Sequence, residues 1–466
     1  MNLKKSKVNF DISERKVLLW LVDLLAIFLS VAALNLSPYF NYIEWSTERW
    51  SYPLVLLGYY TFFALVFELY NLHRASRFDL ILYPLVSALS MTVLLFLMTP
   101  LVTPVLPEHR LDLVYFFIAI NACVIFWRFL YINLFGKPWF YKWVILVAKH
   151  KEVALLSQAL MASDPHYKII GYLDITQKAT ASKSIDGIPL VAMNELVSKL
   201  EKEGVRDIVV ANSSHYKIDL GLYNHLLDLS KKGTVIRDYS QVYESMNGRV
   251  PIQQVKKEFY RFFPYHRNNQ NKLALLFQRF LDLVICVVGL VVFFPLFWLV
   301  IMVLNPIFNP GPVFYTQDRI GLNGKVFRIL KFRTMGVNAE KTGPQYTTKD
   351  DHRVRPFARL LRRLRVDEFP QLINIIKGDM HLIGPRPERP QFVSKLNKSI
   401  PFYEVRHVIK PGLTGWAQVN HNYGTSQDDA LIKLQYDLYY IKNRSFFLDL
   451  SIMIKTLSTV LFMRGQ

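Results

Sequence analysis

Cysteine is nearly absent from this chain of 466 residues, and the only two, Cys123 and Cys286, lie inside apolar segments. Two isolated cysteines of this kind exclude a disulfide framework and a cysteine metal site, and we interpret both as small core residues. A small-residue cleavage signal is also lacking after the basic N-terminus. We therefore predict that the first apolar run is kept as a membrane helix and is not removed as a signal peptide.

Acidic residues are scarce relative to basic ones, 36 against 56, which gives a formal net charge of +20. Such an excess fits three partners: nucleic acid, an anionic membrane surface, or a phosphorylated substrate. Hydrophobic residues make up 52% of the chain and fall in long runs. These runs favour the lipid bilayer as a partner, and we expect no nucleic-acid partner.

Four apolar runs open the chain, and each is close to the roughly 20 residues that span a bilayer as a helix. They cover residues 17–36, 52–70, 80–102 and 113–135. Lysine and arginine gather before the first run, between the second and third, and after the fourth, which predicts that both ends of the bundle face the cytoplasm. We assign residues 1–138 to this four-helix transmembrane bundle. Asp23 and Arg128 lie within it, as buried partners or near helix ends, and we give them no chemical role.

Residues 139–264 alternate short apolar runs with helical patterns, which predicts a Rossmann-like α/β domain with a small doubly wound sheet. A dinucleotide-binding domain needs glycines directly after its first strand. This turn reads Ala148-Lys149-His150-Lys151 and has none. We therefore favour a structural or assembly role for this domain over cofactor binding.

A polar linker is predicted at 265–272, followed by an apolar run at 280–304 that is long enough to cross the membrane. Pro295 lies near the middle of that run. Because proline removes a helical hydrogen bond and kinks the helix, the run either crosses the membrane or turns back to the same side. The residues of this run leave both topologies open.

Two basic segments follow. The stretch PVFYTQDRIGLNGKVFRILKFRTM places Lys331 and Arg333 on an alternating, strand-like run. Neighbouring cations suit phosphate groups, although a solvated edge strand is the more common meaning of this pattern. Residues 353–366 then combine apolar residues at helical spacing with arginines on the other faces. This pattern is typical of a helix in the membrane interface, or of a basic helix packed on a core.

Two adjacent carboxylates, Asp367 and Glu368, end that helix and are followed at once by Phe369-Pro370. Adjacent acids are common on surfaces, but the upstream cations would keep these ionised. One carboxylate can act as a nucleophile toward phosphorus while its neighbour helps to hold Mg²⁺. Asp379 is either a further acid near the site or a turn residue. Arg386 lies between two prolines, on a stiff loop suited to phosphate recognition.

Three stretches together resemble a known family. They are GPVFYTQDRIGLNGKVFRILKFRTM, VDEFPQLINIIKGDMHLIGPRPE, and KPGLTGWAQVN with the later YDLYYIKN. The chain is similar to the bacterial polyprenyl-phosphate sugar-1-phosphate transferases, the monotopic phosphoglycosyl transferases, over residues 272–466. Its upstream part is similar, in layout more than in motif, to the large subclass with four transmembrane helices and a Rossmann-like domain.

This resemblance implies a membrane protein of α plus α/β class whose membrane-associated α+β catalytic domain, 273–466, contains a re-entrant helix, 280–304, broken at Pro295. It implies transfer of a sugar 1-phosphate from a UDP-sugar to polyprenyl phosphate, with Mg²⁺ as cofactor and release of UMP. Asp367 would be the nucleophile, and Glu368 would support the metal. The substrate phosphates would be bound by Lys331, Arg333, Arg363, Arg365 and Arg386.

The reaction would start exopolysaccharide, capsule or O-antigen synthesis at the bacterial inner membrane, with the catalytic domain on the cytoplasmic side. The sequence also allows a homo-oligomer. Two other hypotheses stay open. One is a non-catalytic membrane scaffold for polysaccharide machinery, and the other is an NAD-dependent nucleotide-sugar enzyme built on the α/β domain, against which the missing glycines argue.

Overall fold

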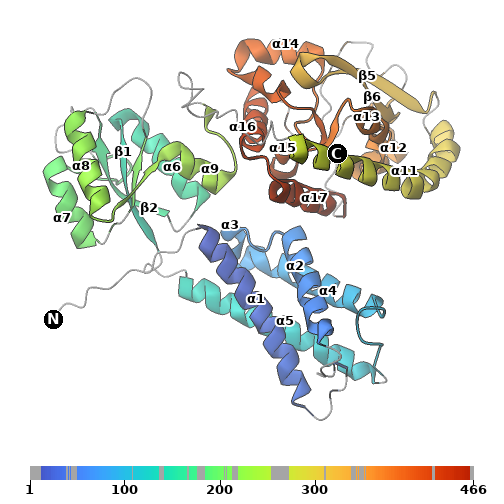
Figure 1. Ribbon diagram of the computed structural model, residues 1–466, viewed down its shortest axis with the longest axis horizontal. Helices are drawn as coiled ribbons and strands as arrows, with labels where there is room; N and C mark the ends of the chain where they lie inside the picture. The colour runs from blue at the N-terminus through green and yellow to red at the C-terminus, as the bar shows by residue number, and fades with distance from the viewer. Residues whose placement is uncertain are drawn as a thin grey trace. The chain divides into compact units, whose positions relative to one another are not determined.

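In the computed structural model the chain forms two compact units, residues 1–247 and 248–466 (Figure 1). The residues that the structure describes are 12–37, 40, 42–43, 50–107, 109–135, 141–164, 167–175, 184–203, 205, 207–211, 219–252, 272–308, 311–336, 339, 343, 345, 351, 353–421, 424 and 426–461.

The first unit begins with the apolar helices α1 (Ile12–Asn35), α2 (Ser51–Val66), α4 (Phe78–Met98) and α5 (Arg110–Phe135), with the short α3 (Leu72–Ala75) between α2 and α4. By length and composition α1, α4 and α5 can each cross a membrane, whereas α2 has only 16 residues. At about 1.5 Å per residue, α2 reaches roughly 24 Å, less than the roughly 30 Å of a hydrocarbon core. The second predicted span is therefore shorter than its apolar run suggested.

Asp23 and Arg128 are partners inside this bundle. Arg128 Nη2 donates to Asp23 Oδ2 at 2.5 Å, and both side chains are fully buried. Tyr60 Oη donates to the same carboxylate oxygen at 2.6 Å. Charged groups at membrane depth need such partners, so of the two readings the sequence left open, the structure selects buried partners over positions near helix ends.

The rest of the first unit is a parallel four-stranded sheet of order β2-β1-β3-β4, as the alternating pattern predicts. Its strands are β1 (Lys142–Ala148), β2 (Tyr167–Asp174), β3 (Asp207–Val210) and β4 (Val235–Asp238). Its helices are α6 (Val153–Ser163), α7 (Met193–Glu203), α8 (Leu220–Lys231) and α9 (Tyr239–Asn247). Alternate residues of β1 pack into different cores: Val144 and Leu146 with α6 and α9, Ile145 and Val147 with α7 and α8. The sheet is therefore covered on both faces (Figure 1).

The predicted linker, 265–272, lies outside the described residues except for Lys272, where the long helix α11 (Lys272–Phe308) begins. Val250 and Ile252, upstream of that linker, already pack in a core of the second unit. The first part of α11, Lys272–Val292, is long and apolar enough to cross a membrane. Pro295 follows that part, and the ribbon of α11 changes direction along its length (Figure 1).

The rest of the second unit consists of short elements around two small sheets. An antiparallel hairpin joins β5 (Phe314–Ile320) to β6 (Val326–Phe332), and β7 (His381–Ile383) pairs in parallel with β8 (Gly412–Thr414). The helices are α12 (Pro356–Arg363), α13 (Gln371–Lys377), α14 (Pro390–Ser399), α15 (Trp416–Asn420), α16 (Gln427–Asn443) and α17 (Phe446–Leu461). Single 3₁₀ turns lie at Leu322–Gly324, Val366–Glu368 and Tyr403–His407.

Candidate active site

The acid pair lies in the 3₁₀ turn Val366–Glu368, between α12 and α13. Arg365, directly before it, has a left-handed backbone with φ of 57°. Such a conformation is strained for a side chain other than glycine, and it turns the chain sharply at the end of α12. Asp367 and Glu368 are both only 6% exposed. The turn therefore carries both carboxylates into the protein.

Glu368 is surrounded by cations. Its Oε1 accepts hydrogen bonds from Lys331 Nζ at 3.0 Å and Arg386 Nη2 at 2.6 Å, and its Oε2 accepts one from Arg365 Nη1 at 3.3 Å. Burial alone would raise the pKa of Glu368, but the charges of Arg386, Lys331 and Arg365 outweigh it and hold the pKa well below its usual range. Glu368 is therefore an ionised anchor that joins β6, the 3₁₀ turn and the Arg386 loop.

Asp367 has the opposite environment. None of the described residues donates a hydrogen bond to its carboxylate, which lines a pocket instead. Burial raises its pKa to about 6, and the neighbouring charge of Glu368 acts in the same direction. The charges of Lys331 and Arg362 lower it and offset part of this effect. Asp367 is thus a desolvated carboxylate that faces open space among cations.

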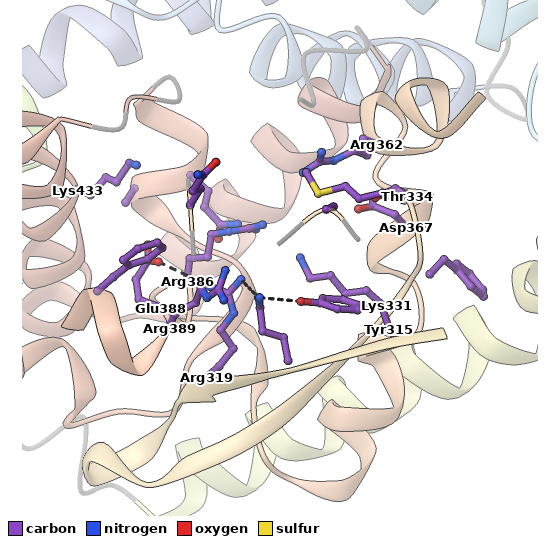
Figure 2. Close-up of a pocket in the computed structure, with 18 of the residues that line it drawn as sticks. Tyr315, Arg319, Lys331, Thr334, Arg362, Asp367, Arg386, Glu388, Arg389 and Lys433 are labelled. Atoms are coloured by element: carbon purple, nitrogen blue, oxygen red, sulfur yellow. Dashed lines mark hydrogen bonds and ion pairs between the residues drawn. The ribbon is translucent and has the colours of Figure 1, made fainter. Parts of the chain in front are cut away.

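The pocket that Asp367 lines has a volume of ≈ 260 Å³. Figure 2 shows Asp367 and Arg362 at one end and Lys433 at the other, with Arg386, Arg319 and Arg389 between them. Eight arginine and lysine residues line the pocket, together with the aromatic rings of Tyr315 and Phe392. Three carboxylates also line it, those of Asp367, Glu388 and Asp437. A concave pocket with aromatic walls, in which cations outnumber carboxylates, suits an anionic substrate such as a phosphate ester.

Known proteins with similar sequences identify the family of the chain. Residues 273–463 match the family described as bacterial sugar transferase. Over 186 residues the chain is 36% identical to the UDP-glucose:undecaprenyl-phosphate glucose-1-phosphate transferase of Caulobacter vibrioides, covering 40% of this chain and 69% of that protein. The chain belongs to the bacterial sugar transferase family. The resemblance predicted from its motifs is confirmed.

Two further relatives of this sugar transferase are longer. Over 226 residues it is 41% identical to the UDP-N-acetylgalactosamine-undecaprenyl-phosphate N-acetylgalactosaminephosphotransferase of Aeromonas hydrophila, covering 47% of this chain and 51% of the relative. Over 311 residues it is 32% identical to the UDP-glucose:undecaprenyl-phosphate glucose-1-phosphate transferase of Xanthomonas campestris, covering 63% of this chain and 61% of the relative. The chain thus spans about half to three fifths of the length of these two relatives.

The predicted phosphate-binding residues of the sugar transferase occupy three kinds of position. Lys331, Arg333 and Arg386 line the pocket. Arg365 binds Glu368 and is not among the lining residues. Arg363 is exposed at the end of α12 and does not line the pocket, whereas its neighbour Arg362 does. Pro295 is likewise absent from the lining residues and lies inside α11, which runs as one helix from Lys272 to Phe308.

Local contacts explain why these residues meet. Asn374 on α13 is 4% exposed, accepts from the backbone N–H of Leu330 at 3.0 Å and donates to the carbonyl oxygen of Arg328 at 2.7 Å. It therefore ties the strand that carries Lys331 to the helix that follows the acid pair. Asn374 also donates to Asp379 Oδ2 at 3.1 Å, so that acid supports the turn after α13.

The Arg386 loop lies directly against the glycine-rich segment before α15. A Cβ added to Gly412 would lie 2.0 Å from the backbone nitrogen of Gly384, and one added to Gly415 would lie 2.1 Å from the carbonyl oxygen of Gly384. Only glycine permits backbones to approach this closely. The KPGLTGW motif is therefore needed to seat the loop that carries Arg386.

The sequence pattern did not predict the buried group of Arg406, Asp437 and Tyr403 beside that loop. Arg406 Nη2 donates to the carbonyl oxygen of Arg386 at 3.0 Å and to Asp437 Oδ2 at 2.8 Å. Its Nη1 donates to Tyr403 Oη at 2.5 Å. Burial raises the pKa of Asp437 to about 6, against the lowering effect of the Arg406 charge. The acid inside the YDLYY segment, Asp437, could have indicated a buried ion pair, but its partner Arg406 lies 31 residues away in the sequence.

Among the described residues, no group of three or more His, Cys, Asp or Glu side chains is arranged so that it could hold a metal ion. Mg²⁺ often needs only one or two carboxylates, because phosphates and waters complete its shell. Oε1 of Glu368 already accepts two hydrogen bonds, whereas Oε2 accepts one and keeps a lone pair. Oε2 of Glu368 could therefore hold a Mg²⁺ ion that substrate phosphates would complete, although Glu368, unlike Asp367, is not among the residues that line the pocket.

Proposed function

We propose that this protein transfers a sugar 1-phosphate from a UDP-sugar to undecaprenyl phosphate through a covalent bond to Asp367. One observation carries the proposal: Asp367 faces the cationic pocket without a hydrogen bond from the described residues, while Glu368 is held by three cations. The names of the relatives supply the two substrates. A non-catalytic scaffold would not need a desolvated carboxylate in such a pocket.

In the first step, the Asp367 carboxylate attacks the phosphorus that carries the sugar. The bond from this phosphorus to the bridging oxygen of the diphosphate breaks, and UMP leaves with that oxygen. In the second step, a phosphate oxygen of undecaprenyl phosphate attacks the same phosphorus and the bond to Asp367 breaks. The products are an undecaprenyl diphosphate sugar and a free carboxylate, ready for another cycle.

The cations of the pocket have a clear task in both steps. Lys331 and Arg362 lie at the Asp367 end of the pocket, where negative charge gathers on the phosphoryl oxygens, and Arg386 lies between this end and Lys433 (Figure 2). Cations fixed in place before the reaction stabilise such charge without reorganising. A Mg²⁺ ion held by Glu368 and the diphosphate would supply further charge neutralisation at the leaving oxygen.

This chemistry also defines the topology that we propose. A cytoplasmic UDP-sugar and the pocket must lie on the same side of the membrane, so α11 enters and leaves the bilayer on that side and turns near Pro295. The protein is then a multi-pass protein of the bacterial inner membrane with its catalytic unit in the cytoplasm. The product would begin the assembly of exopolysaccharide, capsule or O-antigen.

The decisive experiment detects the covalent step. The protein, purified in detergent and free of undecaprenyl phosphate, is incubated with Mg²⁺ and UDP-sugars that carry a radioactive sugar, and protein-bound label and UMP are measured. We expect both to form in equal amounts, and the label to leave the protein when undecaprenyl phosphate is added.

Asp367→Asn should give neither label nor UMP, because an amide cannot displace UMP. Asp428→Asn is the matched control, since Asp428 is an exposed acid on α16 outside the pocket lining. Normal turnover by Asp367→Asn would refute the assignment of the nucleophile. Release of UMP by the unaltered protein without bound label would refute the covalent step.

A further inference from the structure

Helix α11 carries a narrow polar stripe on an otherwise apolar surface. Arg279 and Asp282 lie three residues apart and therefore on one face of the helix, and the buried Cys286 continues that face. Phe280 is 60% exposed, which is the pattern of a helix with one side toward lipid. Asp282, by contrast, is only 3% exposed. A buried charge on such a helix requires a specific partner.

Asp282 finds its partners in strand β7. Its Oδ2 lies 2.5 Å from His381 Nδ1, and its Oδ1 accepts from the backbone N–H of Leu382 at 3.2 Å. Because a carboxylate only accepts, the Nδ1–H of His381 is the donor in this pair. After Ile383, β7 continues directly into the loop that carries Arg386, whose guanidinium binds Glu368. Asp282 thus holds the strand that leads into the arginine loop.

Arg279 holds the other half of the site. Its Nη1 donates to the carbonyl oxygen of Ile375 at 2.5 Å, and its Nη2 donates to that of Ile376 at 2.7 Å. Both carbonyls belong to the last turn of α13, and that of Ile375 also accepts from the backbone N–H of Gly378 at 3.0 Å. Cys286 also packs in one core cluster with Leu372 and Ile375 of α13. Since α13 begins shortly after Glu368, Arg279 holds the helix at whose start the acid pair lies.

We propose that Arg279 and Asp282 are positioning residues, through which the membrane helix α11 sets the distance between the acid pair and the Arg386 loop. The inference rests on the proposed function and adds a task for α11 beyond membrane attachment. One face of α11 connects to both parts of the site, by one side chain each. Losing either side chain would therefore change the geometry of the phosphate site although neither residue lines the pocket.

The test counts active sites and measures their speed separately. The burst of radioactive label on the protein gives the number of active sites, and its rate constant gives the speed of the first step. Asp282→Leu should keep the burst amplitude per folded molecule and slow labelling on the order of tenfold to a hundredfold, as expected for a small misplacement. Asp282→Asn should remain within about threefold of the unaltered rate, because the other tautomer of His381 restores the pair.

Phe280→Leu is the matched control on the exposed face of α11 and should leave the rate unchanged. A smaller burst with an unaltered rate constant in Asp282→Leu would mean that Asp282 only stabilises the fold, and would overturn the proposal. If Asp282→Leu yields no folded protein, Arg279→Met carries the same test. Absence of label on the unaltered protein would instead refute the proposed function.

A second measurement does not depend on activity. Hydrogen exchange of the peptide covering residues 381–386 should accelerate in Asp282→Leu, while exchange in the hairpin β5–β6 stays unchanged. Equal protection of residues 381–386 in both proteins would show that Asp282 does not hold the arginine loop, and would overturn the inference whatever the activity.

Discussion

Replacing Asp367 by Asn should abolish transfer and at the same time stabilise the catalytic unit. Burial raises the pKa of this carboxyl from its ordinary value of 3.8 to about 6, so above pH 6 the folded protein must hold a charge that burial disfavours. At about 1.36 kcal/mol per pKa unit, this corresponds to roughly 3 kcal/mol of stability lost at pH 7.5. Asn carries no charge and avoids that loss, so the substitution should gain stability where it loses activity.

The pH dependence of this gain has a definite sign. Below pH 3.8 the carboxyl is protonated in both the folded and the unfolded protein, and the substitution should make almost no difference. The gain grows as the pH rises from about 4 to 6, reaching roughly half its full value at pH 5, and is constant above about pH 7. Thermal unfolding of the purified protein in detergent should therefore show a higher midpoint for Asp367→Asn at pH 7.5, by several degrees.

Asp437→Asn is a matched comparison with the opposite expectation. Burial also raises the pKa of Asp437 to about 6, and by the same linkage argument the loss of its charge alone would stabilise the folded protein. However, Asp437 binds Arg406, and the two side chains are only 2% and 4% exposed. Removing the acid leaves a buried guanidinium without its counter-charge, which typically destabilises a protein by about 3–5 kcal/mol. A lower midpoint for Asp367→Asn at pH 7.5, or an equal gain at pH 4, would refute the reasoning.

Three further predictions concern Arg362, Glu368 and the topology of α11. In the pH profile of UMP release, the rise on the acid side should shift upward from about pH 6 in Arg362→Gln, because the Arg362 charge lowers the pKa of the proposed nucleophile Asp367. Arg363→Gln should leave that rise in place. Identical pH profiles for the two variants would contradict this prediction. Glu368→Gln should lower the thermal midpoint at pH 7.5, since three cations lose a shared counter-charge; an unchanged midpoint would count against the anchor role. In a chain without native cysteines, Lys272→Cys and Gly311→Cys should be labelled from the same membrane side; opposite sides would exclude a re-entrant α11.

The sequence alone predicted the parts of the fold that depend on local patterns. The alternation of strands and helices predicted the parallel sheet, and uninterrupted apolar runs predicted the membrane helices. The end of α2 at Val66 was not predicted, because Phe67 and Leu69 continue the apolar run although the backbone leaves the helix. Hydropathy reports which residues avoid water, and it does not report where a helix ends.

The site was predictable only where its residues are close in sequence. The acid pair and Arg386 lie within one stretch, so the motif contained them. Asp282 and His381 are 99 positions apart, and no local pattern joins them. Arginine positions on α12 were ambiguous for another reason: consecutive residues point roughly 100° apart, so Arg362 faces the pocket and Arg363 does not. Only the packing of α12 decides which of these two arginines lines the pocket.

The adjacent acids Asp367 and Glu368 show how one turn creates two different chemical groups. Both carboxylates are buried to the same extent, so burial alone would raise both pKa values. The left-handed turn at Arg365 starts the 3₁₀ turn that directs one toward three cations and the other toward the pocket. Environments that separate the pKa values of neighbouring acids commonly separate their tasks. Glu368 keeps its charge and fixes the cations, and the charges of Lys331 and Arg365 in turn lower the pKa of Asp367, which favours the ionised form that the proposed attack on a phosphate requires.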